Sequence, residues 1–414
     1  MRMLKLEIKR VIKTRLTVIL LLLALGLTFL LAWLPTTFPG LSYLDENGNY
    51  VELKGRDATL YEKQVQASVA GDVTTDKVRK ALEDYQAVLR KYNVETSIEL
   101  PEGVYGTEIL PMEPLLHGLS EAYANRKTGL APAVMDRDPE KLTDYYVMLE
   151  ERVESIGRLE QPDHPAAQKA EVDAYQKIDK PYQFYPGYNQ DAMDYQLLLG
   201  FLILCICAVI SAPIFTSDYQ TGADDILWCT KYGRGRLAWI KILSALIVTS
   251  ATMALCSTLY LVISDSLFGW ESTKTSIQML YSIVSLPNMN IAQFQIFVAI
   301  ASLLSVLATV CMTLLLSAKC KNIMVSLSGA LIFCVIPIVL YMALPQNIGN
   351  WIYPLFPASG AGIQTSFLYN AIDFKYLNFG NLAIWLTDAM LIVCIVEIPL
   401  FSFLAVHSYT HRKG

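Results

Sequence analysis

The chain has 414 residues, of which 53% are hydrophobic and only 17% charged, with a formal net charge of -5. This composition is too apolar for an ordinary soluble protein, and no basic tract is long enough to suggest nucleic-acid binding. Charged residues are almost absent from several long stretches, as in membrane-spanning segments. We therefore expect an all-α integral membrane protein with six transmembrane helices and a mainly helical extracellular domain between the first and second.

Six stretches contain about 20 apolar residues each, the length that a helix needs to cross the hydrocarbon core. The predicted spans are 16–34, 195–216, 237–264, 294–317, 323–344 and 382–406. The first apolar run is longer than the core of a signal peptide, and Trp33-Leu34-Pro35 is a poor cleavage site. We interpret this run as a retained membrane anchor.

Lysine and arginine concentrate in four short segments that a six-span chain places on one side of the membrane. These residues are Arg2, Lys5, Lys9, Arg10, Lys13 and Arg15, then Lys231, Arg234, Arg236 and Lys241, then Lys319 and Lys321, and finally Arg412 and Lys413. The opposite short loops contain only Lys274 and Lys375. The positive-inside rule therefore predicts a multi-pass plasma-membrane protein with a cytoplasmic N-terminal segment (1–15) and a cytoplasmic tail (407–414).

The predicted extracellular domain, residues 35–193, is long enough to pack a core of its own. Apolar residues recur at helical spacing between Thr74 and Asn93, and again after Asp138, which with Pro139 is typical of a helix start. Residues 165–179 are a possible third helix, and residues 47–55 predict a hairpin or an extended arm. The domain contains no cysteine, so we expect it to fold without disulfides.

The predicted cytoplasmic loop 217–236 combines amphipathic and basic parts. Phe215, Tyr219, Ile226 and Trp228 are apolar residues among three aspartates, and a glycine-containing basic turn follows them. This pattern predicts a short helix, within 217–230, that lies flat on the inner membrane surface before the chain re-enters at the headgroups. A plain interfacial linker is the alternative interpretation of the same pattern.

This loop resembles the coupling-helix region of the ABC type-two export permeases. Asp218, Gly222, Leu227, Arg234 and Lys241 stand at that family's intervals, although family members usually have Glu in place of Asp218 and Pro in place of Lys231. The basic segment 1–15 also looks like the family's amphipathic interfacial helix. The resemblance covers the membrane part, whereas the 35–193 domain matches no family that we can name.

The resemblance implies a permease subunit that is not itself an enzyme and binds no cofactor. A separate ATP-binding cassette ATPase would bind ATP and Mg²⁺, and two permeases, identical or different, would form the pathway within the membrane lipids. The residues expected to couple the permease to the ATPase are Asp218, Tyr219, Gly222, Ile226, Leu227, Trp228, Arg234 and Lys241. The chain has no phosphate-binding P-loop motif, which is equally true of any protein that is not an ATPase.

Two acidic residues within the last span are candidates for the transport pathway. Charges inside a membrane are costly, so Glu397 is expected in a gate or in a buried structural hydrogen bond, with equal weight. Asp388 is more readily explained as an interfacial carboxylate. The loop 345–381 is apolar and aromatic but too broken to span, so we expect a re-entrant or interfacial element in which Trp351, Tyr353 and Phe356 form an outer gate.

No cluster in the sequence has the ligand number of a metal site, because His407 and His411 form only a pair. The favoured function is therefore the permease subunit of an ATP-driven exporter that moves a lipid, peptide or drug. A membrane-anchored sensor or scaffold with an extracellular ligand-binding domain is the alternative. A secondary transporter is less favoured, because no inverted repeat is visible.

Overall fold

The computed structural model describes residues 2–230 and 233–411, so Lys231, Arg412 and Lys413 lie outside the described residues. Six helices within this part of the chain are long and apolar enough to cross a membrane, as the sequence predicts. They are α2 (Arg15–Trp33), α9 (Gln190–Ser211), α12 (Gly235–Phe268), α13 (Ile291–Lys319), α14 (Ile323–Ala343) and α17 (Leu386–Thr410). The protein therefore has the helical content of a multi-pass membrane protein.

The last predicted span requires a correction at its start. Residues 382–385 form strand β6 (Leu382–Trp385), which pairs antiparallel with β5 (Tyr376–Phe379) across the two-residue turn Gly380-Asn381. Such a dipeptide between two short apolar runs is typical of a hairpin. It is a better guide here than the apolar character of residues 382–385, which had suggested the start of the span. Helix α17 consequently begins at Leu386 rather than at residue 382.

Helix α13 lies at the centre of the bundle, packed against α9, α12, α14 and α17. Helices α9 and α13 are the most deeply buried spans, and the other four leave much of their apolar surface uncovered. Exposed leucine and isoleucine side chains along α2, α14 and α17 form that surface. Since apolar surface of this extent suits lipid or another apolar protein, the bundle is built for a bilayer.

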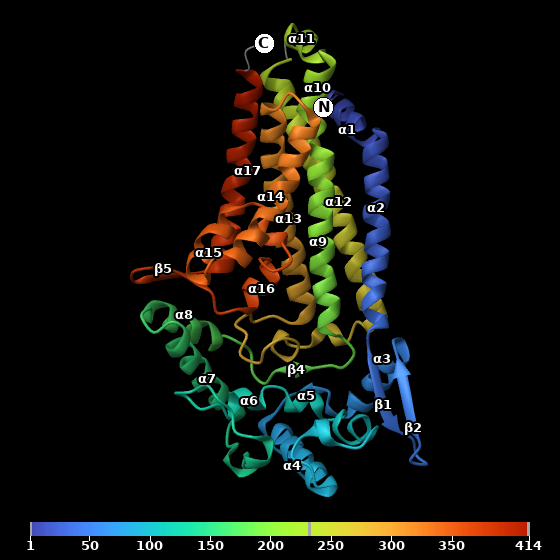
Figure 1. The fold of residues 1–414 in the computed structure, drawn as a ribbon, viewed down its shortest axis with the longest axis vertical. Coiled ribbons are helices and arrows are strands. Elements are labelled where there is room, and N and C mark those ends of the chain that lie inside the picture. Colours follow the sequence, from blue (N-terminus) through green and yellow to red (C-terminus); the bar gives the residue numbers. More distant parts are fainter. Residues whose placement is uncertain (1, 231–232, 412–414) are drawn as a thin grey trace.

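The two ends of the bundle differ in what they carry (Figure 1). Helix α1 (Arg2–Ile12), helix α10 (Pro213–Thr221), helix α11 (Ala223–Trp228) and the C-terminal end of α17 gather at one end. The domain between α2 and α9, here called the inserted domain, lies at the other end (Figure 1). The turn with Lys319 and Lys321 also lies at this end, because Tyr219 and Gln220 of α10 bond to its neighbours Ala318 and Asn322. The first three predicted basic segments thus share an end, while the compartment that each end faces stays a prediction.

The inserted domain is mostly helical but also contains short strands, so the all-α prediction holds only approximately. Its elements are β1 (Gly40–Leu44), β2 (Tyr50–Lys54), α3 (Arg56–Gln66), β3 (Gly71–Asp72), α4 (Thr75–Tyr92), α5 (Glu113–Leu116), α6 (Leu119–Ala122), α7 (Tyr145–Glu160), α8 (Pro165–Tyr175) and β4 (Gln183–Phe184). Residues 47–55, predicted as a hairpin or an extended arm, contain part of the turn and strand β2 of a hairpin whose other strand, β1, lies before that range. Of Thr74 and Thr75, the two threonines at the predicted start of helix α4, Thr74 is the cap, and its hydroxyl accepts the Lys77 N–H.

Two features of the inserted domain differ from the sequence-based expectation. Asp138 caps only a short 3-10 turn, and α7 begins at Tyr145, where the side chain of Asp144 accepts two backbone N–H groups. The loop between α12 and α13 contributes Ile283 and Leu286 to the core of the domain. The domain is therefore completed by residues far beyond its predicted boundary at 193.

Candidate functional site

The chain changes direction sharply at the end of the bundle that carries α1 and α11. Pro213 begins α10 directly after α9, and α10 ends at Gly222, which has a left-handed backbone conformation (φ 67°). The six-residue helix α11 follows at once. Because L-residues with a Cβ are disfavoured at this φ, glycine suits the junction between the two helices. The predicted surface helix 217–230 is therefore two elements, and Asp218 belongs to the first of them.

Asp218 lies at the centre of a buried charge cluster. Its carboxylate accepts hydrogen bonds from the Lys241 ammonium on α12 and from Arg10 Nη2 on α1, the latter at 2.5 Å. Both Asp218 and Lys241 have 0% exposure. Lys241 Nζ also donates to the Ile214 carbonyl at 3.1 Å, so the cluster joins α1, α10 and α12.

The charges of this cluster balance one another. Glu7 lies 3.7 Å from Arg10 Nη1, so two carboxylates face two cations. A buried charge without a partner is expensive, whereas a compensated and hydrogen-bonded set is tolerated. Arg10 and Glu7, which the sequence indicates only as part of a basic interfacial helix, are therefore members of this site.

A serine from the central helix holds the start of α10. Ser317 Oγ on α13 accepts the backbone N–H groups of Phe215 and Thr216 at 3.0 and 3.2 Å. It also donates to the carbonyl of Ala212 at 2.7 Å. These N–H groups belong to the first turn of α10, so Ser317 acts as its cap from a neighbouring helix. The orientation of α10 is consequently tied to α13 as well.

Helix α11 projects from the end of the bundle and presents part of its surface. The side chain of Ile226 is 74% exposed, and Asp225 and Gly222 are exposed beside it. Leu227 and Trp228 are half-buried, and the Trp228 ring packs edge-on against Tyr409 of α17 at 5.9 Å. The exposed guanidinium of Arg234 lies over the Trp228 ring, 5.5 Å from its centroid. Trp228 therefore anchors α11 to the bundle, and the exposed side chain of Ile226 is available for contact with another molecule.

The eight predicted coupling residues thus divide into two groups with different roles. Asp218 and Lys241 have no exposed surface and join helices, so neither offers a side chain to a partner in the isolated chain, and their part in coupling stays a prediction. Tyr219 is half-buried, and its hydroxyl donates to the Ala318 carbonyl at 3.2 Å. Ile226 and its exposed neighbours are the accessible part. Sequence periodicity could not separate these groups, because the break at Gly222 rotates α11 relative to α10.

The predicted gate loop packs against α13 and α17, and its re-entry into a membrane stays a prediction. It contains α15 (Gln346–Ile352), α16 (Phe367–Ile372) and the β5–β6 hairpin. Tyr353 is fully buried, and its hydroxyl donates to Asn370 Oδ1 at 2.9 Å. Ser305 Oγ of α13 donates to the Pro357 carbonyl at 2.5 Å. The loop is therefore attached to the central helix and not folded over its surface.

The other two predicted gate residues lie nearer the surface of this loop. Trp351 is 41% exposed, and its ring meets the edge of Phe379 at 4.8 Å. Phe356 is half-buried against Phe333 of α14. Trp351 also lines a cavity of about 590 Å³ together with Gln161 of the inserted domain. The loop and the inserted domain are thus neighbours across this cavity.

The two acidic residues of α17 occupy different environments. Glu397 is only 7% exposed, and its Oε2 has no hydrogen-bond partner among the described residues. Asp388, near the start of the helix, is exposed in the isolated chain. Burial of Glu397 agrees with either of its predicted roles, and exposure of Asp388 agrees with an interfacial carboxylate.

Among residues 2–230 and 233–411, no group of three or more histidine, cysteine, aspartate or glutamate side chains is arranged to hold a metal ion. His407 and His411 lie side by side, with ring centroids 4.2 Å apart, as their spacing predicts. No protein-family model matches this chain, and no curated protein matches it.

Proposed function

We propose that this chain is the transmembrane permease subunit of an ATP-driven ABC exporter that moves a hydrophobic or amphipathic substrate outward. A separate ATP-binding cassette ATPase would bind ATP and Mg²⁺ and drive the permease through α11. A second permease, identical or different, would complete the pathway within the bilayer. The substrate class would be a lipid, a peptide or a drug, because the exposed faces of the bundle are apolar.

The observation that carries this proposal is the coupling of an exposed helix to a rigid buried charge cluster. Helix α11 presents Ile226 at one end of the bundle, directly after the helix that holds Asp218. Asp218 is bonded to both α1 and α12, and Ser317 bonds the same helix to α13. A push on α11 would therefore be transmitted to several spans together, since buried ion pairs and capping bonds resist separation.

The surface chemistry of α11 limits which partner would fit. Ile226 supplies an apolar contact, and Asp224 and Asp225 place negative charge in the first turn of the helix. The complementary surface is an apolar cleft with a basic rim, and central apolar residues of this kind dominate binding energy at interfaces. The half-buried Trp228 would fix the angle at which α11 enters that cleft.

The transport pathway would run toward the re-entrant loop at the other end of the bundle. Tyr353 and Asn370 hold this loop against α13 and α17, and Glu397 lies buried in α17. In this proposal the loop is the outer gate, and relative tilting of the helices would open it. Its attachment to the central helix α13 provides the mechanical link.

A membrane-anchored sensor or scaffold is the second candidate, because the inserted domain contains a cavity of about 290 Å³ with charged residues in its lining. The two candidates differ at α11. A sensor needs no ATPase at this helix, whereas in a permease ATP hydrolysis could not drive transport without an ATPase bound there.

The test is co-purification of the full chain with an ATPase encoded beside it. Replacing Ile226 with Asp places a charge in the proposed contact, and we expect it to abolish co-purification and the stimulated ATP hydrolysis. Ile98→Asp is the matched control, because Ile98 is an isoleucine of 93% exposure in the inserted domain. Equal ATPase recovery with wild type and Ile226→Asp, or the absence of any crosslink from a cysteine at position 226 to an ATPase, would refute the proposal.

A further inference from the structure

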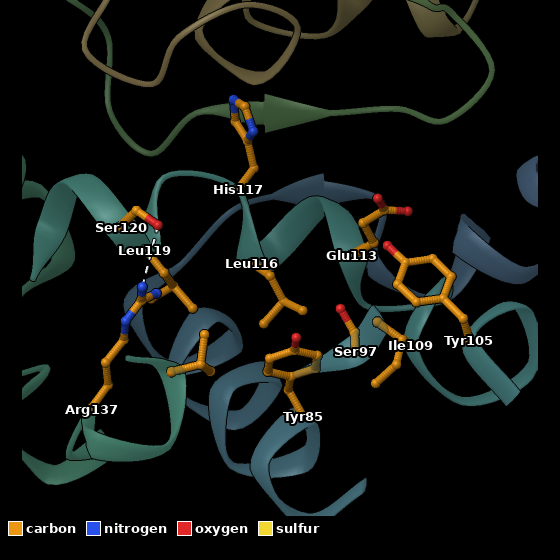
Figure 2. Close-up of a pocket in the computed structure, with 11 residues that line it drawn as sticks. Tyr85, Ser97, Tyr105, Ile109, Glu113, Leu116, His117, Leu119, Ser120 and Arg137 are labelled. Carbon is orange, nitrogen blue, oxygen red and sulfur yellow. Dashed lines mark hydrogen bonds between the residues drawn. The ribbon is translucent and has the colours of Figure 1, made fainter. Parts of the chain in front are cut away.

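A cavity of about 290 Å³ opens in the inserted domain between α4, α5 and the segment that leads to α7. Arg137 lies at one end of it, and Glu113 and Tyr105 lie at the opposite end, as Figure 2 shows. Leu116 and Tyr85 lie between the two ends (Figure 2). The cavity therefore has two charged ends of opposite sign and an apolar middle.

Arg137 is a buried cation without a counterion. The residue is 7% exposed, and its guanidinium donates only to neutral acceptors, the Pro132 carbonyl at 3.2 Å and Ser120 Oγ at 3.3 Å. In the described part of the chain, no carboxylate lies within 4.0 Å of its nitrogens, and Nη1 has no hydrogen-bond partner. Buried arginines are normally paired with an anion, so the guanidinium of Arg137 is suited to binding one.

Electrostatics reinforces this need for an anion. Burial lowers the pKa of Arg137, which means that the protein around it disfavours the charged form. A guanidinium nevertheless stays protonated at any physiological pH, so the cost is relieved by a bound anion and not by loss of the proton. The free Nη1 group offers the donors that a carboxylate would use.

The opposite end of the cavity is negative. Glu113 is exposed there, and a second carboxyl group, Glu62, is close enough to feel its charge. Burial and the charge of Glu113 raise the pKa of Glu62, so the two acids repel one another. A cation placed beside Glu113 would reduce that repulsion. This end of the cavity therefore suits an ammonium group.

We propose that this cavity binds a short peptide with free termini and apolar side chains, its carboxylate on Arg137 and its ammonium beside Glu113. The site holds whether or not the chain is a permease. Leu116, Leu119 and Ile109 supply the apolar wall for the side chains, and Tyr85 adds an aromatic face.

Reach and volume restrict the ligand to a few residues. In a free amino acid the ammonium and carboxylate groups are attached to the same carbon atom, so the molecule is too short to reach both ends of the cavity. Each added residue extends a peptide by roughly 3.5 Å, and two or three residues separate the termini enough to bridge the apolar middle. The cavity is smaller than a typical drug-binding pocket of about 300–1,000 Å³, which excludes a long peptide lying wholly inside it.

The test uses the full chain in nanodiscs of neutral phosphatidylcholine, with binding followed by isothermal titration calorimetry. The probes are trileucine, its C-terminal amide, its N-acetyl form, free leucine and inorganic phosphate. We expect trileucine to bind, and each capped form and free leucine to bind at least about tenfold more weakly, because each lacks one charge-assisted contact.

Two variants assign the contacts to residues. In Arg137→Gln the amide should bind as well as the free acid, and in Glu113→Gln the acetylated peptide should bind as well as the free amine. Because Glu113 is exposed, its variant should fold even if Arg137→Gln does not. Glu102→Gln is the matched control, an exposed glutamate outside the lining.

Several outcomes would overturn the proposal. These are no binding of trileucine to the wild-type chain, equal affinity for capped and free peptides, and a Glu113→Gln variant that still rejects the acetylated form. Free leucine that binds as tightly as trileucine would contradict the bridging geometry. Phosphate that competes with trileucine at equal affinity would show a simple anion site.

Discussion

The ammonium of Lys241 donates a hydrogen bond to the carboxylate of Asp218, and both side chains are completely excluded from solvent. The two residues belong to α12 and α10, so this pair closes the loop that contains α11. Arg10 of α1 completes the charge balance from the other side. The exposed helix is thus joined to the bundle through ionic contacts that tolerate little change.

Removing one partner of this pair should destabilise the protein strongly. Lys241→Met leaves the buried Asp218 carboxylate with only the partly exposed Arg10, and we expect a loss of about 3–5 kcal/mol in the free energy of unfolding. The double variant Asp218→Asn/Lys241→Met should lose less than the sum of the single changes, because no unpaired charge remains. Thermal unfolding of the purified chain in detergent measures all three.

Arg10→Met is the control for that experiment. Its side chain is 44% exposed, so water screens its contribution, and we expect a loss of about 1 kcal/mol or less. A Lys241→Met protein that unfolds at the wild-type temperature would contradict the importance of the buried pair.

The inserted domain should lose stability as pH rises, because of Glu171. This residue on α8 has 0% exposure, and neither carboxyl oxygen has a hydrogen-bond partner among the described residues. Burial, and then the charge of Glu160, raise the pKa of Glu171 from 4.5 to about 8. Between these two values the folded chain keeps a proton that the unfolded chain releases, so stability falls with rising pH and levels off above about 8.

Glu171→Gln removes this titration. We expect it to unfold at a higher temperature than wild type at pH 9, with a gain of roughly 1–3 kcal/mol, because a neutral amide avoids the desolvation cost of the buried, unpaired carboxylate charge. The exposed Glu83→Gln on α4 serves as the control and should leave the pH profile unchanged. A wild-type unfolding temperature that is level between pH 5 and pH 8 would rule out the predicted linkage.

Gly118 should tolerate alanine poorly, because the inserted domain and the loop before α13 meet there. A Cβ at Gly118 would lie 2.6 Å from the Tyr145 hydroxyl and 2.7 Å from Ile283 Cβ. Gly48 has nearly the same backbone angle, φ +78° against +79°, but nothing within 4 Å of its Cβ position. Gly48→Ala should therefore cost about 1 kcal/mol from the backbone alone, and Gly118→Ala about 1–3 kcal/mol more. Equal unfolding temperatures for the two variants would disprove the steric contribution.

Tyr353→Phe tests the gate loop with a minimal change. Loss of the hydroxyl leaves the buried Asn370 Oδ1 without its donor, and we expect a cost of about 1–2 kcal/mol and an altered transport rate. Recovery of the ATPase should be unaffected, because α11 lies at the other end of the bundle (Figure 1). The exposed Trp351→Phe is the control for stability. Unchanged transport in Tyr353→Phe would exclude a gating role for this contact.

Most of the membrane architecture could be predicted from the sequence. Uninterrupted apolar length identifies the spans, because the bilayer core imposes one length on any helix that crosses it. Local signals also narrowed the cap of α4 to Thr74 or Thr75 and indicated a hairpin or an extended arm where strand β2 lies, because these features depend on residues close in the chain. The start of the last span was missed, because apolar residues of a strand and of a helix look alike until the Gly380-Asn381 turn is recognised.

In the candidate site, too, the sequence indicated some residues and missed the contacts between them. Intervals in the sequence brought Asp218 and Lys241 into one group, but spacing alone could not show that they bond to each other and are buried. Arg10 and Ser317 join the site from distant helices. Arg10 is 208 positions from Asp218 in the chain, and Ser317 is 102 positions from Phe215. Nothing in the sequence marks Arg137 as a site residue. It stands out only because no carboxylate lies near it in the fold, and the sequence does not show which residues surround it.

The sequence by itself determined which segments are helices of membrane length, where basic residues accumulate and where an insertion interrupts the spans. These properties follow from composition and short-range periodicity, which each segment carries alone. Only the tertiary structure decided which charges neutralise one another, which face of α11 is accessible, and which residues line the cavity of the inserted domain. Those outcomes depend on distances between segments far apart in the chain, and distance, burial and charge balance arise only when the segments pack.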